Sequence, residues 1–234
     1  MSANNLKLLL IGGFGFNELP LKGISGLFGE YRFIDINQFG EDYTLEMMAD
    51  KLIQIQSQYM ANYIVAFSMG GLLVLKAMEL SAIPLADKVI LFNSTPCFMT
   101  KENWQGVSHQ DYESLLTRLS SSSFDSFMTY LSRFFAYPYP ISKEVDYKKW
   151  WANTNHKRLL NLLSIFLATD LREGCAKFID QIIWINSSED ILVKMNQSRH
   201  NSFTLANSSH LLFDKHQLNQ LFNNHILSLE GSNG

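Results

Sequence analysis

The chain has 234 residues, of which 47% are hydrophobic and 18% charged, and a formal net charge of −3. This length and composition predict one globular domain, and the charge gives no overall basic surface of the kind that nucleic acids bind. Cys97 and Cys175 lie far apart without CxxC spacing and are expected to be buried free thiols. The first apolar run is too short for a signal peptide, and no run reaches the length of a membrane span. We therefore expect a cytoplasmic protein with neither a nucleic-acid nor a membrane partner.

Short apolar runs alternate with amphipathic stretches through the first 93 residues. The apolar runs predict strands at 6–12, 31–36, 63–67 and 88–93, and the amphipathic spacing predicts helices at 42–59 and 70–80. Strands that are apolar on both faces and alternate with helices form a parallel sheet covered by helices.

The alternation stops after the fourth strand. Residues 96–166 are rich in aromatic side chains and helix-like, whereas strand signals return at 181–186 and 202–206, before a last helix at 215–228. A helical segment inserted between two parts of a sheet is typical of a lid. We therefore expect a single α/β domain over 1–234, with a helical lid at about 97–166.

The stretch "YIVAFSMGGLLVL" (63–75) places Ser68 between an apolar strand and a helix. A serine at a sharp strand-to-helix turn, with small residues two positions away on each side, is the nucleophile elbow of a hydrolase. Here those neighbours are Ala66 and Gly70, and Ala66 departs from the usual glycine. The backbone N–H of Met69 would then face an oxyanion at the helix N-terminus. The plainer alternative is a serine that caps an ordinary helix.

A nucleophilic serine needs a histidine base and a carboxylate. His210 follows the strand at 202–206, and Asp190 follows the strand at 181–186, so the order serine, acid, histidine is the one that α/β-hydrolases use. Glu189 and Asp170 are the competing acids. The remaining histidines either lie on the last helix or fall outside the expected position; they are His216, His225, His109, His156 and His200.

The glycines in "IGGFGF" (11–16) allow two interpretations. Gly13 and Gly15 begin a dinucleotide fingerprint with Asp35 as the ribose-binding acid, but Glu18 stands where the third glycine is needed. The same loop could instead donate a second N–H, from Phe14, to an oxyanion. This interpretation is preferred because it also accounts for the serine elbow. No phosphate-binding loop or metal-ligand spacing is present in the sequence, so no cofactor and no metal are expected.

With these motifs, the chain resembles the pimeloyl-[acyl-carrier protein] methyl ester esterases of biotin synthesis, within the α/β-hydrolase superfamily. "IGGFGFN" (11–17) is similar to the family's H-G-W-G loop, with Gly12 in place of histidine and Phe14 in place of tryptophan. "FSMGGLLVL" (67–75) is similar to its elbow. "NSTPCFMTKENWQGV" (93–107) resembles its S-S-P-C-F stretch and the W-x-G that follows, and "ATDLRE" (168–173) its T-x-D-L-R segment.

The resemblance implies a cytoplasmic hydrolase that cleaves the methyl ester of a pimeloyl group bound to acyl carrier protein. It places the catalytic triad on Ser68, Asp190 and His210. A general carboxylesterase without a carrier protein, and a catalytically silent ligand-binding hydrolase, are the alternatives.

Two further sets of residues are predicted to serve such a substrate. Aromatic side chains could together line a slot for the acyl chain, although each alone is better explained as lid core; they are Phe14, Phe98, Trp104, Phe127 and Phe134. Residues 133–158 contain six basic and two acidic side chains, a net charge of +4. This basic segment could attract an acidic carrier protein, or it could simply form a solvated face of the lid. The residues expected at this docking surface are Arg133, Lys143, Lys148, Lys149 and Arg158.

Overall fold

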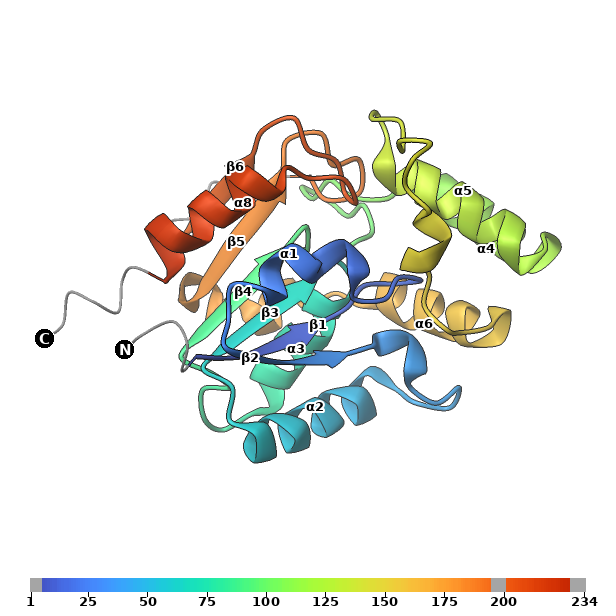
Figure 1. The fold of residues 1–234 in the computed structure, drawn as a ribbon. Helices are drawn as coiled ribbons and strands as arrows, with labels where there is room; N and C mark the ends of the chain where they lie inside the picture. Colours follow the sequence, from blue (N-terminus) through green and yellow to red (C-terminus); the bar gives the residue numbers. More distant parts are fainter. Residues whose placement is uncertain (1–5, 195–200, 228–234) are drawn as a thin grey trace, which may run out of the picture.

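A six-stranded parallel sheet forms the centre of the molecule (Figure 1). The structure is a computed structural model that describes residues 6–194 and 201–227. The strand order is β2-β1-β3-β4-β5-β6, and all five neighbouring pairs are parallel. The strands are β1 (Lys7–Ile11), β2 (Glu30–Ile34), β3 (Tyr63–Phe67), β4 (Lys88–Phe92), β5 (Ile182–Ser187) and β6 (Ser202–Leu205).

Both faces of the central strands are buried, because successive side chains of a strand point to opposite sides. In β1, for example, Leu9 and Ile11 belong to one core cluster, and Leu8 and Leu10 belong to the other. This explains why the central strands read as continuous apolar runs and not as alternating patterns.

Helices cover both faces of the sheet. The first core cluster contains buried residues of α2 (Leu45–Tyr59) and α3 (Gly70–Leu80), and the second contains buried residues of α1 (Lys22–Ser25), α8 (Lys215–Leu221) and the π-helical turn η6 (Phe222–Ile226). Figure 1 shows α2 and α3 on the opposite side of the sheet from α1 and α8. The predicted α/β-hydrolase arrangement, a mainly parallel sheet flanked by helices, is confirmed.

An insertion between β4 and β5 carries α4 (His109–Ser121), α5 (Phe124–Ala136), the turn η4 (Tyr147–Trp150) and α6 (His156–Ala168). The side chains of Ser108, Ser123 and Asn155 accept hydrogen bonds from the first turns of these α-helices and so fix where each begins. Figure 1 shows all three helices at one end of the sheet, to its right. Their action as a lid stays a prediction. The short helix α7 (Arg172–Cys175) and the 3-10 turn η5 (Ile179–Gln181) then lead back to β5.

Several elements differ from their expected bounds. The helix expected at 42–59 begins at Leu45, and the last helix ends at Leu221 and continues as the turn η6. β2 ends at Ile34, not at residue 36, because the side chain of Asp35 accepts the N–H of Asn37 and starts the 3-10 turn η3 (Ile36–Gln38). A second 3-10 turn, η2 (Leu19–Leu21), follows the first loop.

Within the two described ranges, no helix combines the length and apolar character required to cross a membrane.

Candidate active site

Ser68 stands at the turn between β3 and α3, with a positive φ of 52°. This left-handed conformation is rare for any residue other than glycine and costs about 1–3 kcal/mol, so the surroundings must impose it. The N–H of Ser68 donates to the carbonyl of Phe92 at 2.9 Å, and its carbonyl accepts the hydroxyl of Ser94 at 2.7 Å. These bonds to the end of β4 hold the strained turn in place.

The glycines after Ser68 are required by close packing. A Cβ at Gly70 would collide with the carbonyl oxygen of Gly12, and one at Gly71 would collide with the hydroxyl of Ser94. The two glycines therefore let α3 start directly against the ends of β1 and β4. Gly13 is also confined, since a Cβ there would lie 2.8 Å from Cδ1 of Phe67 and 3.2 Å from the Cβ of Ser68.

His210 joins Ser68 to Asp190. Its Nε2 lies 2.8 Å from the Ser68 hydroxyl and its Nδ1 lies 2.7 Å from Oδ2 of Asp190. All three side chains are buried, and the His210 ring packs between Phe67 and Phe135, with centroid distances of 5.2 and 4.9 Å. The structure thus brings together the three residues that were predicted as a triad.

The other oxygen of Asp190 is fixed by the backbone. Its Oδ1 accepts the N–H groups of Leu192 at 2.8 Å and of Val193 at 3.0 Å, which leaves Oδ2 for the histidine. The competing acids lie elsewhere: Glu189 is exposed, and the carboxylate of Asp170 pairs with Arg172 at 2.8 Å. Hydrogen bonding to that guanidinium lowers the pKa of Asp170.

Asn93 supports the triad and was not predicted by the sequence analysis. Its φ is 46°, and its Nδ2 donates to the carbonyl of His210 at 2.9 Å and to the hydroxyl of Ser187 at 3.0 Å, while its Oδ1 accepts the N–H of Ser187. One buried amide therefore ties the loop of the histidine to the end of β5, which precedes Asp190. The sequence did offer one indication of this role, because Asn93 is a polar residue directly after the buried strand β4.

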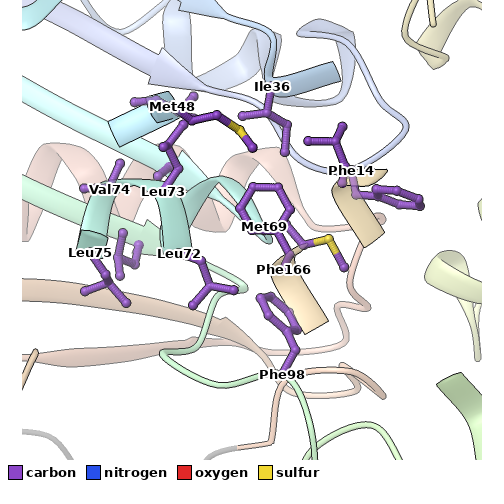
Figure 2. Close-up of a cluster of buried hydrophobic side chains, with 14 of the residues drawn as sticks. Phe14, Ile36, Met48, Met69, Leu72, Leu73, Val74, Leu75, Phe98 and Phe166 are labelled. Atoms are coloured by element: carbon purple, nitrogen blue, oxygen red, sulfur yellow. The ribbon is translucent and has the colours of Figure 1, made fainter. Parts of the chain in front are cut away.

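The two predicted oxyanion donors lie near this site. Met69 follows the serine, and Phe14 belongs to the loop that packs against it. In the described part of the chain, neither of their backbone N–H groups has a protein acceptor. Figure 2 shows the side chains of Met69 and Phe14 in the buried apolar cluster near Phe98 and Phe166.

A narrow cavity opens on Ser68. Its lining residues are Phe14, Ser68, Met69, Phe98, Val107, Asp111, Ser114, Leu115, Tyr130, Phe134, Phe135, Leu167 and Leu192. Of the residues predicted for an acyl slot, Phe14, Phe98 and Phe134 line this cavity. A wider, open hollow of about 660 Å³ beside α2 and α6 contains no residue of the triad.

Trp104 and Phe127 do not line this cavity. The indole Nε1 of Trp104 donates to the carbonyl of Cys97 at 2.8 Å, and the Arg172 guanidinium lies over its ring, so this side chain is held away from the serine. Phe127 is buried in the core two helical turns before Phe134, about 10 Å back along α5.

The five predicted docking residues lie on the insertion, but two of them are already paired. Lys148 contacts Asp125 at 3.0 Å and Lys149 contacts Asp146 at 3.6 Å. Arg133 and Lys143 are exposed, and neither forms an ion pair with the part of the chain that the structure describes. Arg158 is half-buried at the start of α6.

The other histidines lie outside the triad. His216 bonds Gln220, the ring of His225 packs on Phe203, and His109 lies beside Glu113. The ring of His156 packs edge-on against Phe124. His200 lies outside the described residues.

No protein-family model matches the chain. Two curated relatives, from Aeromonas salmonicida (strain A449) and Aeromonas hydrophila subsp. hydrophila, are both named pimeloyl-[acyl-carrier protein] methyl ester esterase. The first is 27% identical over 139 residues, or 55% of this chain and 52% of the relative. The second is 29% identical over 111 residues, or 43% of this chain and 42% of the relative. The chain thus spans about half the length of the curated relatives it matches.

Solved structures resemble the chain over nearly its whole length. A bromoperoxidase from Bacillus anthracis has a TM-score of 0.76 at 19% identity, with 97% of this chain and 92% of that chain covered. An esterase from Exiguobacterium antarcticum has a TM-score of 0.76 at 17% identity over the same shares. MenH from S. aureus has a TM-score of 0.71 at 13% identity, with 98% and 96% covered. At these identities the likeness establishes the fold, which is that of the α/β-hydrolases.

Proposed function

We propose that the chain is a serine carboxylesterase that hydrolyses the methyl ester of pimeloyl-[acyl-carrier protein]. The observation that carries the chemistry is the position of His210, whose two ring nitrogens contact Ser68 and Asp190 at 2.8 and 2.7 Å. The names of the two curated relatives support the substrate.

In the first half-reaction, Oγ of Ser68 attacks the ester carbonyl while Nε2 of His210 takes its proton. Asp190 accepts Nδ1–H, which fixes the tautomer and stabilises the imidazolium that forms. The N–H groups of Met69 and Phe14 bind the oxyanion of the tetrahedral intermediate. His210 then protonates the departing methoxide, and methanol leaves a Ser68 acyl-enzyme.

In the second half-reaction, His210 removes a proton from a water molecule that attacks the acyl-enzyme. Collapse of the second tetrahedral intermediate returns the proton to Ser68 and releases the free carboxylate. Both half-reactions use the same two donors, because the oxyanion forms at the same carbonyl oxygen.

The cavity suits an unbranched acyl chain, since Phe14, Phe98 and Phe134 supply apolar walls beside Ser68. Arg133 directly precedes Phe134 on α5, so a free cation stands next to a residue of the cavity wall. An acidic carrier protein docked there could insert its acyl arm toward the serine. We place the reaction in the cytoplasm, where two buried free thiols are expected to stay reduced.

A general carboxylesterase without a carrier protein is the second candidate. The ion pairs of Lys148 with Asp125 and of Lys149 with Asp146 favour it, because they neutralise part of the predicted docking surface. The two candidates share the same triad and differ only in whether the basic surface takes part.

Charge reversal separates the candidates. The double variant Arg133→Glu/Lys143→Glu is assayed on purified pimeloyl-[acyl-carrier protein] methyl ester and on a small p-nitrophenyl ester. Lys88→Glu is the matched control, because Lys88 begins β4 at the opposite end of the sheet from Ser68. If the carrier docks on the insertion, kcat/KM falls about 10-fold or more for the carrier-bound ester only, and added salt reduces wild-type activity toward the level of the variant.

Equal rates of the double variant and the wild type on the carrier-bound ester would contradict carrier docking on this face and favour the general esterase. Failure of the chain to restore growth of a biotin auxotroph that lacks this esterase step would contradict the substrate itself.

A further inference from the structure

A single buried amide holds the loop that carries Phe14. Asn37 is fully buried, and its Oδ1 accepts the N–H of Gly15 at 2.7 Å. Its Nδ2 donates to the carbonyls of Gly13 at 3.0 Å and Phe16 at 3.3 Å. The amide therefore binds backbone groups on both sides of Phe14 and fixes the peptide planes around it.

Asn37 is itself held in place. Oδ1 of Asp35 accepts both the backbone N–H of Asn37 at 2.9 Å and its Nδ2 at 2.7 Å, and the carbonyl of Asn37 accepts the hydroxyl of Thr154 at 3.2 Å. Because these partners restrict its rotamer, the amide is preorganised before any ligand binds. Asp35, considered above as a ribose-binding acid, thus serves as a local anchor.

The far end of the same loop is attached to the insertion through Asn17. Its N–H donates to the carbonyl of Trp150 at 2.8 Å, and its Nδ2 donates to the carbonyls of Lys149 at 2.7 Å and Trp151 at 3.0 Å. The N–H of Ala152 also donates to the carbonyl of Gly15 at 2.9 Å. The loop is therefore fixed on one side to the turn η3, which follows β2, and on the other to residues 149–152.

The loop so fixed lies against the serine, as the close approach of Gly13 to Ser68 shows. Gly15 has a φ of +77°, a conformation that glycine adopts without strain and other residues rarely adopt, so the turn after Phe14 requires a glycine. We infer that Asn37 and Asn17 are positioning residues that aim the N–H of Phe14 at the oxyanion. This inference rests on the proposed esterase function.

The expected effect is specific to the transition state. A donor that is misplaced by a fraction of an ångström loses most when full negative charge develops on the carbonyl oxygen, and loss of one donor lowers kcat by about 10²–10³-fold in a known case. We expect Asn37→Ala to lower kcat by about 10–100-fold with little change in KM, because the donor is displaced and not removed. Asn17→Ala should act in the same direction but more weakly, because Asn37 still holds the loop.

Gln56 provides the matched control. It is a buried amide whose Nε2 donates to the carbonyls of Ala61 at 2.8 Å and Leu85 at 2.6 Å. Ala61 precedes β3 and Leu85 precedes β4, so Gln56 lies at the end of the sheet opposite to Ser68. Gln56→Ala removes comparable hydrogen bonds and should lower the melting temperature without changing kcat.

The test compares kcat, KM and inhibition by an alkyl trifluoromethyl ketone for the three variants and the wild type. Ser68 adds to this ketone, its proton passes to His210, and the carbonyl oxygen becomes an anion in the oxyanion site. If the inference holds, the affinity for the ketone falls by the same factor as kcat/KM in Asn37→Ala and in Asn17→Ala, and stays at the wild-type value in Gln56→Ala.

The inference would be overturned if Asn37→Ala kept the ketone affinity and the kcat of the wild type and showed only a lower melting temperature. If Asn37→Ala does not fold, Asn17→Ala at its half-buried site decides in the same way. A wild-type protein that neither hydrolyses esters nor binds the ketone would instead contradict the proposed function.

Discussion

The aromatic ring of Phe135 packs edge-on against the imidazole of His210, with a centroid distance of 4.9 Å and an interplanar angle of 69°. The carbonyl of Phe135 also accepts the N–H of Leu211 at 3.0 Å. Helix α5 of the insertion therefore contacts the histidine loop through both a side chain and the backbone. The insertion thus supports the position of His210 and also lines the cavity.

This contact predicts that Phe135→Leu lowers kcat on p-nitrophenyl esters by about 10-fold, because the imidazole gains room to leave its position between Ser68 and Asp190. Phe127→Leu on the same helix is the control, since Phe127 is buried but lies outside the cavity. Equal kcat values for Phe135→Leu and the control would show that the ring does not hold the base.

A second prediction ranks the two candidate acids. Asp190→Asn should lower kcat by orders of magnitude, about 10⁴-fold in the serine-protease precedent, because the amide favours the wrong imidazole tautomer. Asp170→Asn should leave kcat within a few-fold of wild type, because its partner is Arg172 and not His210. The reverse ranking in steady-state assays would move the acid of the triad to Asp170.

A third prediction uses the same Asp170→Asn variant to test stability against pH. The hydrogen bond from Arg172 lowers the pKa of Asp170, so the folded state holds this carboxyl ionised to a lower pH than the unfolded state does. The ion pair should therefore contribute at most ~1 kcal/mol at pH 7, and this contribution is lost as the pH falls below about 4. Thermal unfolding should show a lower melting temperature for the variant at pH 7 and a smaller difference near pH 3. A difference that grows toward acid would contradict this assignment.

The fourth prediction concerns the acyl chain. Phe134→Ala should shift the preference of the enzyme toward longer or branched acyl esters, because Phe134 is part of the cavity wall. Phe127→Ala removes a buried aromatic ring from the core and should cost about 3–5 kcal/mol of stability, with no change in preference. A series of p-nitrophenyl esters from acetate to decanoate measures the chain-length profile of each variant and of the wild type. Identical profiles for Phe134→Ala and the wild type would count against the acyl slot.

The strands and the elbow could be predicted because their signals are local. A buried run of apolar residues and a small–x–Ser–x–Gly turn each depend on neighbours within a few positions. The positions of Asp190 and His210 followed from the order of strands, which places their loops at the same edge of a parallel sheet.

The supporting residues could not be predicted, because their roles depend on contacts across long sequence separations. Asn37 bonds a loop more than 20 residues away, and Asn93 bonds His210 across 117 residues. Trp104 was expected to line the cavity, but its indole N–H donates to the carbonyl of Cys97, and a buried indole N–H usually requires such a partner. The charge of the insertion was likewise visible in sequence, whereas the pairing of Lys148 with Asp125 was not.

Covalent labelling shows whether Ser68 is the nucleophile. A fluorophosphonate reacts with an activated serine, and mass spectrometry of the digested protein locates the adduct. We expect one adduct, on the peptide that contains Ser68. It should form in the wild type, be absent in Ser68→Ala and form at least about 100-fold more slowly in His210→Ala. An adduct on another residue, or ester hydrolysis that persists at the wild-type rate in a folded Ser68→Ala protein, would contradict this role of Ser68.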